Sequence, residues 1–194
     1  ISQMEMERMA AFTFDCTDEM GYPVQKKLVV ELMGKTCNLY LLDPEGQIVD
    51  CLRRIALDES AKRAALPGFH YEKPEKITKQ NPEHLEKEDY VNLLTCAGAD
   101  ELTSRLMDNL GGLSPLVCRE AVLFATGETD TRRENLDISA VAEKLSLFFR
   151  EHLPHPQPCY YPLPDGTIKQ FAFCPILQYG NNQHSESFSA LMDD

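Results

Sequence analysis

The chain has 194 residues, 43% of them hydrophobic and 26% charged, and a formal net charge of −12 at pH 7. These values are ordinary for a globular domain, and they exclude an intrinsically disordered or collagen-like chain. No apolar run reaches the ~20 residues that a membrane span needs, so no transmembrane helix is expected. The chain opens without a Met and without a signal peptide, and we expect it to be part of a longer protein.

The acidic charge is distributed unevenly. Residues 1–80 contain 11 Lys or Arg against 13 Asp or Glu, whereas residues 81–194 contain 8 against 18. Because nonspecific nucleic-acid binding depends on neutralising phosphates, charge alone is not expected to hold a polyanion. Any RNA contact should therefore be local and lie in the first half. The basic doublets there are also compatible with solvent-exposed strand and loop edges: Lys26–Lys27, Arg53–Arg54 and Lys62–Arg63.

The seven cysteines include no CxxC pair, so neither a zinc site nor a thioredoxin-type motif is indicated. Most lie in apolar stretches, and we predict buried, reduced thiols in an intracellular, cytoplasmic compartment. His70 is interpreted as a lone loop histidine. The closest approach to a metal-binding cluster is interrupted by prolines at 154, 156 and 158, and consists of Glu151, His152, His155 and Cys159. We therefore predict no metal and no cofactor.

The first 80 residues have the pattern of an antiparallel β-meander. Alternation over residues 1–14 predicts one half-buried strand, with an apolar face formed by Met4, Met6, Ala10, Phe12 and Phe14 and a polar face by Gln3, Glu5, Glu7 and Thr13. Three β-rich runs follow at 26–33, 37–42 and 47–54, joined by short turns. The three prolines in residues 66–82 and the lack of periodicity there indicate a long ordered loop.

Helical patterns replace the strands after this loop. Leu102, Leu106 and Leu110 form an apolar stripe that predicts a helix over 99–110. Ser114 at the N-cap and Pro115 at the first helical position predict the next helix, to about residue 126. A helix capped by Asp137, a hairpin of strands 160–163 and 167–174, and a helix from about Ser185 complete the chain. The fold class is therefore α+β.

The turn containing Gly111, Gly112 and Ser114 has two readings. Glycines permit a tight reversal between helices, as in a helix-hairpin-helix nucleic-acid module, and the free N–H groups of the second helix could then contact a phosphate. The alternative is an ordinary helix–helix turn. Sequence alone leaves both open.

Arg8 interrupts the apolar face predicted for residues 1–14, where an unpaired guanidinium is costly. A bulge could redirect it, a carboxylate could pair with it, or the face could open onto a ligand site. We expect Glu31, on the neighbouring strand, to be its partner, with Arg8 still partly accessible to solvent.

Three ordered segments together resemble the NFACT family, the ribosome-associated quality-control factors long labelled fibronectin-binding proteins in bacteria. They are ELMGKTCNLYLLDPEGQIVD at 31–50, LPGFHYEKP at 66–74 and LGGLSPLVCREA at 110–121. The resemblance implies a β-domain like the N-terminal domain of DNA glycosylases, followed by a helix-hairpin-helix domain. The implied division is the second half of the NFACT N-terminal domain at 1–80, the helix-hairpin-helix domain at 81–153, a β-hairpin at 154–180 and the start of a coiled-coil arm at 181–194.

The function implied by the resemblance is that of a binding factor, not an enzyme. Family members bind a large ribosomal subunit carrying a stalled peptidyl-tRNA and recruit tRNA, so that an untemplated alanine tail is added by the ribosome. An Asp-Arg pair is needed for the tRNA function and matches Glu7-Arg8 here, with Glu in place of Asp. Together with the Glu31-Leu32-Met33 stretch, these residues are the expected tRNA-binding site.

Two other functions remain open. The older family label implies a surface adhesin that binds fibronectin or fibrinogen, which the absence of a signal peptide and the unpaired cysteines count against. The glycosylase-like fold would suggest a DNA-processing enzyme, but that chemistry depends on an N-terminal proline nucleophile, and this chain begins after any such position.

Overall fold

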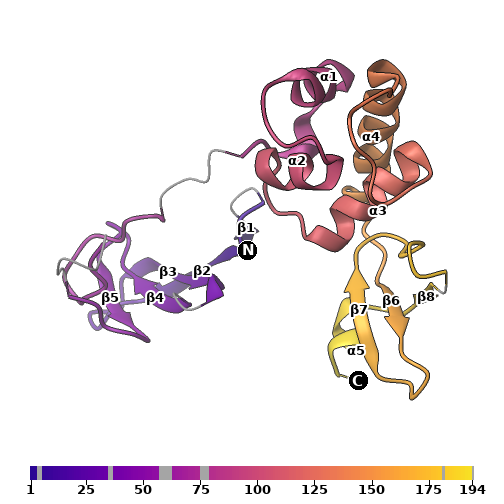
Figure 1. Cartoon of the computed structure of the whole chain (residues 1–194). Helices are drawn as coiled ribbons and strands as arrows, with labels where there is room; N and C mark the ends of the chain where they lie inside the picture. The colour runs from indigo at the N-terminus through magenta and orange to yellow at the C-terminus, as the bar shows by residue number, and fades with distance from the viewer. Residues whose placement is uncertain (4–5, 35–36, 57–62, 75–78, 181, 194) are drawn as a thin grey trace. The chain divides into compact units, whose positions relative to one another are not determined.

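The computed structural model describes residues 1–3, 6–34, 37–56, 63–74, 79–180 and 182–193. The chain forms two compact units, Ile1–Thr78 and Lys79–Asp194 (Figure 1). The boundary lies two residues before the one expected from the sequence. Because Lys79–Asp194 is one unit, its further division at residues 153 and 180 stays a prediction.

The first unit is a five-stranded antiparallel sheet in which every strand pairs with its neighbour in sequence. The strands are β1 (Ser2–Gln3), β2 (Met9–Thr17), β3 (Pro23–Glu31), β4 (Asn38–Leu42) and β5 (Ile48–Cys51). The predicted meander is therefore confirmed. The tight turn before β5 follows the Asp43-Pro44-Glu45-Gly46 sequence, in which Gly46 has a positive φ of 85°.

The prediction of one strand over residues 1–14 is wrong. The segment is a hairpin, because β1 folds back so that Ser2 pairs with Ala11 and Gln3 with Ala10. The face assignment is also wrong: Met9 lies in the core with Ala11 packed against it, whereas Phe14 on the opposite face is exposed. Met4 and Glu5 lie outside the described residues. Apolar side chains on both faces of β2 made alternation a poor guide to the buried side.

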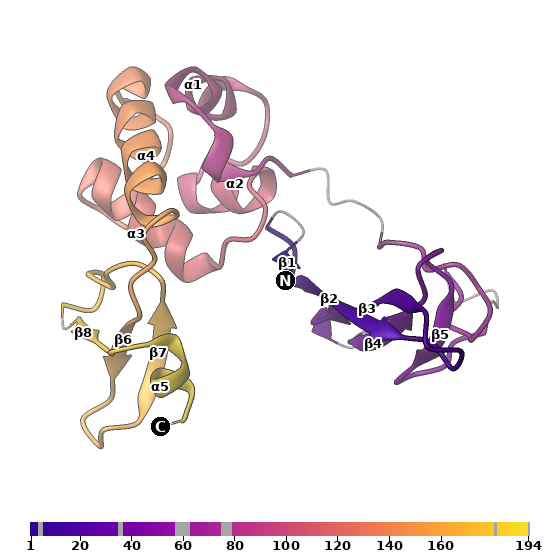
Figure 2. The same cartoon turned by 180° about the vertical axis from the view of Figure 1, so that it is seen from behind.

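A segment without helix or strand, residues 63–74, runs beside the sheet of the first unit and completes its core. Ala65 forms a two-bond bridge with Ile55, and the Phe69 carbonyl accepts from the Ile48 N–H at 2.8 Å. The Tyr71 N–H donates to the Gly46 carbonyl at 3.0 Å. The core consists of Met9, Val29, Tyr40, Leu42, Ile48 and Ala65. The predicted loop is thus held by backbone hydrogen bonds in its part up to residue 74, whereas residues 75–78 lie outside the described residues. Figure 2 shows the same structure from behind.

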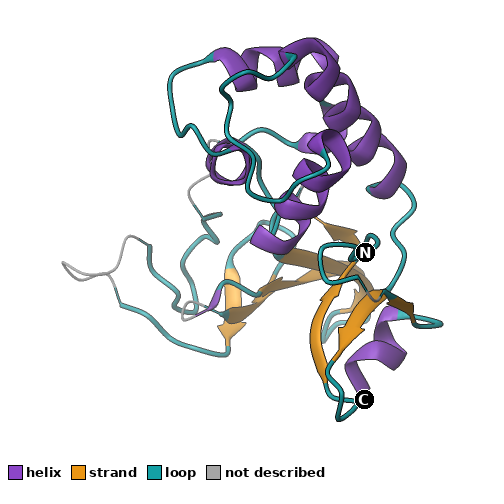
Figure 3. Cartoon of the chain, turned by 45° about the vertical axis from the view of Figure 1, so that its right-hand side comes forward, coloured by secondary structure: helices purple, strands orange, loops and turns teal. Residues whose placement is uncertain are grey.

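The second unit combines helices with a small sheet (Figure 3). Its helices are the 3₁₀ turn η2 (Pro82–His84), α1 (Lys87–Thr95), α2 (Leu102–Asn109), α3 (Pro115–Thr126), α4 (Ile138–His152) and α5 (Phe188–Asp193). Its strands, in spatial order β7-β6-β8, are β6 (Cys159–Pro162), β7 (Ile168–Ala172) and β8 (Gln183–His184). The predicted hairpin and the Asp137 cap are confirmed, whereas α1 and β8 were not predicted.

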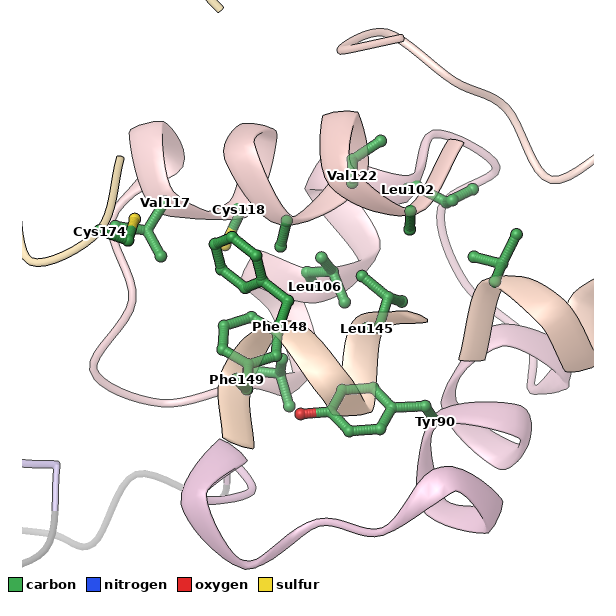
Figure 4. Close-up of a cluster of buried hydrophobic side chains, with 14 of the residues drawn as sticks. Tyr90, Leu102, Leu106, Val117, Cys118, Val122, Leu145, Phe148, Phe149 and Cys174 are labelled. Atoms are coloured by element: carbon green, nitrogen blue, oxygen red, sulfur yellow. The ribbon is translucent and has the colours of Figure 1, made fainter. Parts of the chain in front are cut away.

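The core of the second unit is formed where α1 to α4 meet β6, β7 and the residues after them. Figure 4 shows its helical part together with Cys174. The rings of Tyr90 and Phe149 stack with centroids 6.0 Å apart. Cys118, Cys159 and Cys174 are buried and all seven thiols are free, but Cys96 is exposed, so the prediction of buried cysteines holds only in part. None of the helices in the described part of the chain is long and apolar enough to span a membrane.

Candidate nucleic-acid interface

Arg8 lies in the turn between β1 and β2, immediately before the first residue of β2. Its side chain is exposed, and its carbonyl accepts a hydrogen bond from the Leu32 N–H at 2.8 Å. Glu7 is half-buried, and its carbonyl accepts from the Gln3 side-chain amide at 3.2 Å. The turn is therefore fixed to β1 on one side and to the end of β3 on the other.

Leu32 and Met33 follow directly after β3 and differ in exposure. The Leu32 side chain is 58% exposed, although its backbone N–H is bonded to the Arg8 carbonyl. Met33 is half-buried and packs against the core of the first unit. The structure thus brings Glu7 and Arg8, just before β2, next to Leu32 and Met33, just after β3, with the Arg8 and Leu32 side chains exposed.

Glu31 is not part of that exposed surface. Its carboxylate is fully buried and forms a two-pronged ion pair with Arg63, in which Nη1 donates to Oε1 at 2.8 Å and Nη2 to Oε2. The Tyr71 hydroxyl donates to Oε1 at 2.7 Å. The predicted pairing of Glu31 with Arg8 is therefore wrong. Glu31 points to the core face of β3, whereas Arg8 belongs to a turn outside the strands.

The pKa values of Arg63 and Tyr71 are both raised in this cluster. The hydrogen bonds to Glu31 raise the pKa of the Arg63 guanidinium, against the opposing effect of burial. Burial, followed by the bond to Glu31, raises the pKa of the Tyr71 phenol well above its usual value.

Across the described residues, Arg8 forms no ion pair, so its charge remains available to a partner.

The second candidate site is the turn between α2 and α3. The helices end at Asn109 and begin at Pro115, so the predicted break between them is confirmed. Ser114 is the N-cap of α3, and its hydroxyl accepts from the Val117 N–H at 3.3 Å. Gly112 has a positive φ of 72°, whereas Gly111 does not.

The amides at this helix start are largely occupied. The Gly111 N–H donates to the Gln80 carbonyl at 2.9 Å, and the Cys118 N–H donates to the Ser114 carbonyl at 3.0 Å. Val117 is bound by the cap, and Pro115 has no N–H to offer. An ordinary helix turn explains these bonds, and the phosphate contact at Gly111, Gly112 and Ser114 stays a prediction.

The histidines and cysteines near residue 155 do not form a metal site. Within the described ranges, no group of three or more potential ligands is close enough to hold a metal ion. His152 packs edge-on against Phe148, with centroids 4.7 Å apart. The buried Cys159 thiol instead lies 3.3 Å from Nδ1 of His184. His70 is exposed in the loop of the first unit.

Comparison with known proteins establishes the family. The sequence model described as NFACT N-terminal and middle domains matches residues 1–194. The chain belongs to the NFACT family. Among relatives, the Rqc2 homolog RqcH of Bacillus subtilis is 31% identical over 123 residues, which are 63% of this chain and 21% of the relative. The Rqc2 homolog RqcH of Streptococcus suis is 30% identical over 198 residues, covering 100% of this chain and 31% of the relative.

Solved structures show the same fold. The N-terminal part of the fibronectin/fibrinogen-binding protein from Streptococcus suis has a TM-score of 0.72 at 23% identity, covering 99% of this chain and 64% of that chain. The fibrinogen-binding protein from Staphylococcus aureus has a TM-score of 0.74 at 24% identity, covering 99% of this chain and 67% of that chain. This NFACT chain spans less than a third of the length of the curated relatives it matches.

Two residues that bind the Glu31 carboxylate were not predicted from the sequence. The sequence leaves the doublet that contains Arg63 open between an RNA contact and an exposed loop edge, yet Arg63 and Tyr71 together hydrogen-bond both oxygens of Glu31. The available signal was Glu31 itself, because a carboxylate on the core face of a strand needs buried donors. Sequence could not indicate which of the distant residues supplies them.

Proposed function

We propose that this NFACT chain is part of a tRNA- and large-ribosomal-subunit-binding factor of ribosome-associated quality control. The factor would engage subunits that carry a stalled peptidyl-tRNA and support untemplated alanine tailing of the nascent chain. In this proposal it is a cytoplasmic binding factor, and the ribosome performs the peptide-bond chemistry. The family and the relatives named Rqc2 homolog RqcH support the general role.

The observation that carries the proposal for this chain is the exposed Arg8 turn joined to Leu32. A guanidinium held on a fixed backbone, without a carboxylate partner among the described residues, is suited to a phosphate of a structured RNA. Leu32 supplies an adjacent apolar surface. Glu31 is buried, so we assign it no direct contact with tRNA.

Replacing Arg8 in the complete protein tests the proposal. Arg8→Ala should leave the thermal midpoint unchanged, since the side chain is exposed, while lowering tRNA recruitment to the large subunit and tail synthesis. Arg54→Ala is the matched control, because Arg54 is an exposed arginine of the same unit whose only ion pair is with the exposed Asp50 among the described residues. Loss of folding in Arg8→Ala, or undiminished tailing, would make Arg8 structural and the site assignment wrong.

A surface adhesin that binds fibronectin or fibrinogen is the second candidate function. The structural neighbours are named as fibronectin- or fibrinogen-binding proteins, although likeness below 25% identity shows the fold alone. Immobilised fibronectin distinguishes the two proposals. Saturable binding that Arg8→Ala does not alter, together with undiminished tailing, would favour the adhesin.

A further inference from the structure

The Glu31 carboxylate connects two segments that lie far apart in the sequence. All its hydrogen bonds within the described chain come from residues 32 and 40 positions later, Arg63 and Tyr71. Arg63 is itself held, because its Nη1 also donates to the Glu72 carbonyl at 2.6 Å. The carboxylate therefore ties segment 63–72 to the last residue of β3.

Both donors to Glu31 also pack against the Tyr40 ring. The Tyr71 ring meets the Tyr40 ring edge-on with centroids 5.0 Å apart, and the Arg63 guanidinium lies 5.9 Å from the centre of the Tyr40 ring. Tyr40 is on β4, which pairs with β3, so Arg63 and Tyr71 both contact the sheet that carries Glu31. Met33 packs against the same core as Tyr71.

We propose that Arg63 and Tyr71 are positioning residues for the surface formed by Arg8 and Leu32, and that they act through Glu31. Leu32 is the next residue after Glu31, and its N–H is bonded to the Arg8 carbonyl. Rotation of the Glu31 backbone would therefore move Leu32 and weaken its bond to the Arg8 turn. The inference rests on the proposed function, because it adds residues to the same surface.

A purely stabilising cluster is the competing explanation, and a matched pair of tyrosine variants separates the two. Tyr71→Phe removes only the hydroxyl that donates to Glu31. Tyr90→Phe removes a buried hydroxyl of the other unit, which donates to the Pro82 carbonyl at 3.4 Å. Arg63→Lys is a second variant of the cluster, since it keeps the charge but loses the two-pronged geometry.

The test measures amide hydrogen exchange of Leu32 and tRNA recruitment in the complete protein. Exchange at Leu32 should become about tenfold faster in Tyr71→Phe and in Arg63→Lys, the equivalent of one lost hydrogen bond. It should stay unchanged in Tyr90→Phe. Recruitment of tRNA should fall in the two cluster variants and not in Tyr90→Phe, even where the melting temperatures are lowered equally.

The outcomes identify which statement fails. Unchanged Leu32 exchange in both cluster variants would overturn the positioning role, whatever happens to tRNA recruitment. Faster exchange with full tRNA recruitment in the cluster variants, but reduced recruitment in Arg8→Ala, would overturn the role of Arg63 and Tyr71 and leave the proposed function standing. Full recruitment in Arg8→Ala as well would overturn the proposed function, and with it this inference.

Discussion

The carboxylate of Glu120, on helix α3, accepts hydrogen bonds from both the backbone and the side chain of Gln178. Oε1 of the buried carboxylate accepts from the Gln178 N–H at 3.0 Å and from its side-chain amide at 2.8 Å. Oε2 accepts from the Leu177 N–H at 3.0 Å. A single carboxylate therefore fixes the turn that follows β7 to the helical part of the second unit.

Replacing this carboxylate by an amide should destabilise the second unit. Glu120→Gln places an NH₂ group against backbone N–H donors, and we expect it to lower the free energy of unfolding by about 1–3 kcal/mol. Urea denaturation measures the change. Glu134→Gln, at an exposed loop residue, is the control and should lie within about 0.5 kcal/mol of the original protein. Equal midpoints for the two variants would contradict the assignment.

The cap of α3 gives a second prediction. Ser114→Ala removes the hydroxyl that accepts from Val117, and should cost about 1 kcal/mol of unfolding free energy. Ser139→Ala, at an exposed position in the first turn of α4, makes no cap and should be nearly neutral. Thermal unfolding at neutral pH compares them. A Ser114 variant as stable as the Ser139 variant would show that the cap contributes nothing.

The two glycines of the α2–α3 turn should respond differently to a methyl group. Gly112→Ala forces a side chain into the left-handed region and should cost about 1 kcal/mol. At Gly111 the added Cβ would meet the Gln80 carbonyl oxygen at an ordinary 3.7 Å, so Gly111→Ala should cost much less. The denaturation midpoints of the two variants show which substitution destabilises the protein more. A reversed order would mean that the turn is not formed as described.

Buried thiols should make the second unit less stable at alkaline pH. Burial raises the pKa of Cys118 and of Cys174 to about 12, from an ordinary value near 9. Below pH 9 the two thiols are protonated in the folded and the unfolded protein alike. Between pH 9 and 12 they lose the proton in the unfolded protein but keep it in the folded one. Stability should therefore fall between pH 9 and 12, by up to about 1.4 kcal/mol per pH unit for each thiol. Unfolding at pH 8 and 10 tests this, and Cys118→Ala should flatten the slope.

The sequence predicted those parts of the fold that local chemistry determines. The Pro-Gly turn before β5, the Ser114 and Asp137 caps and the hairpin of β6 and β7 all follow from residues within a few positions of one another. The β1–β2 hairpin was missed because the residues before Met9 carry no glycine, proline or asparagine turn signal. Helix α1 was missed because its buried face is short.

The candidate site shows the limit of sequence reasoning more sharply. Arg8 was correctly expected to be accessible, but the choice of partner for Glu31 required a three-dimensional structure, because Arg63 lies 32 residues away. Arg105 is a similar case in the second unit. It looks like an exposed residue of an amphipathic helix, yet it is 1% exposed, and its guanidinium donates to the carbonyls of Leu93, Cys96 and Ala99.

Asn38, the buried residue that begins β4, joins the start of that strand to the segment that follows β5. Its side-chain amide donates to the Arg53 carbonyl at 2.9 Å and its oxygen accepts from the Arg53 N–H at 2.8 Å, in the manner of a peptide group. Asn38 also faces Glu31 across the β3–β4 pair. Deamidation would remove the donor and place a second carboxylate beside the first. A change of this one side chain from amide to carboxylate would therefore disturb both the bonds to Arg53 after β5 and the buried Glu31 next to Leu32.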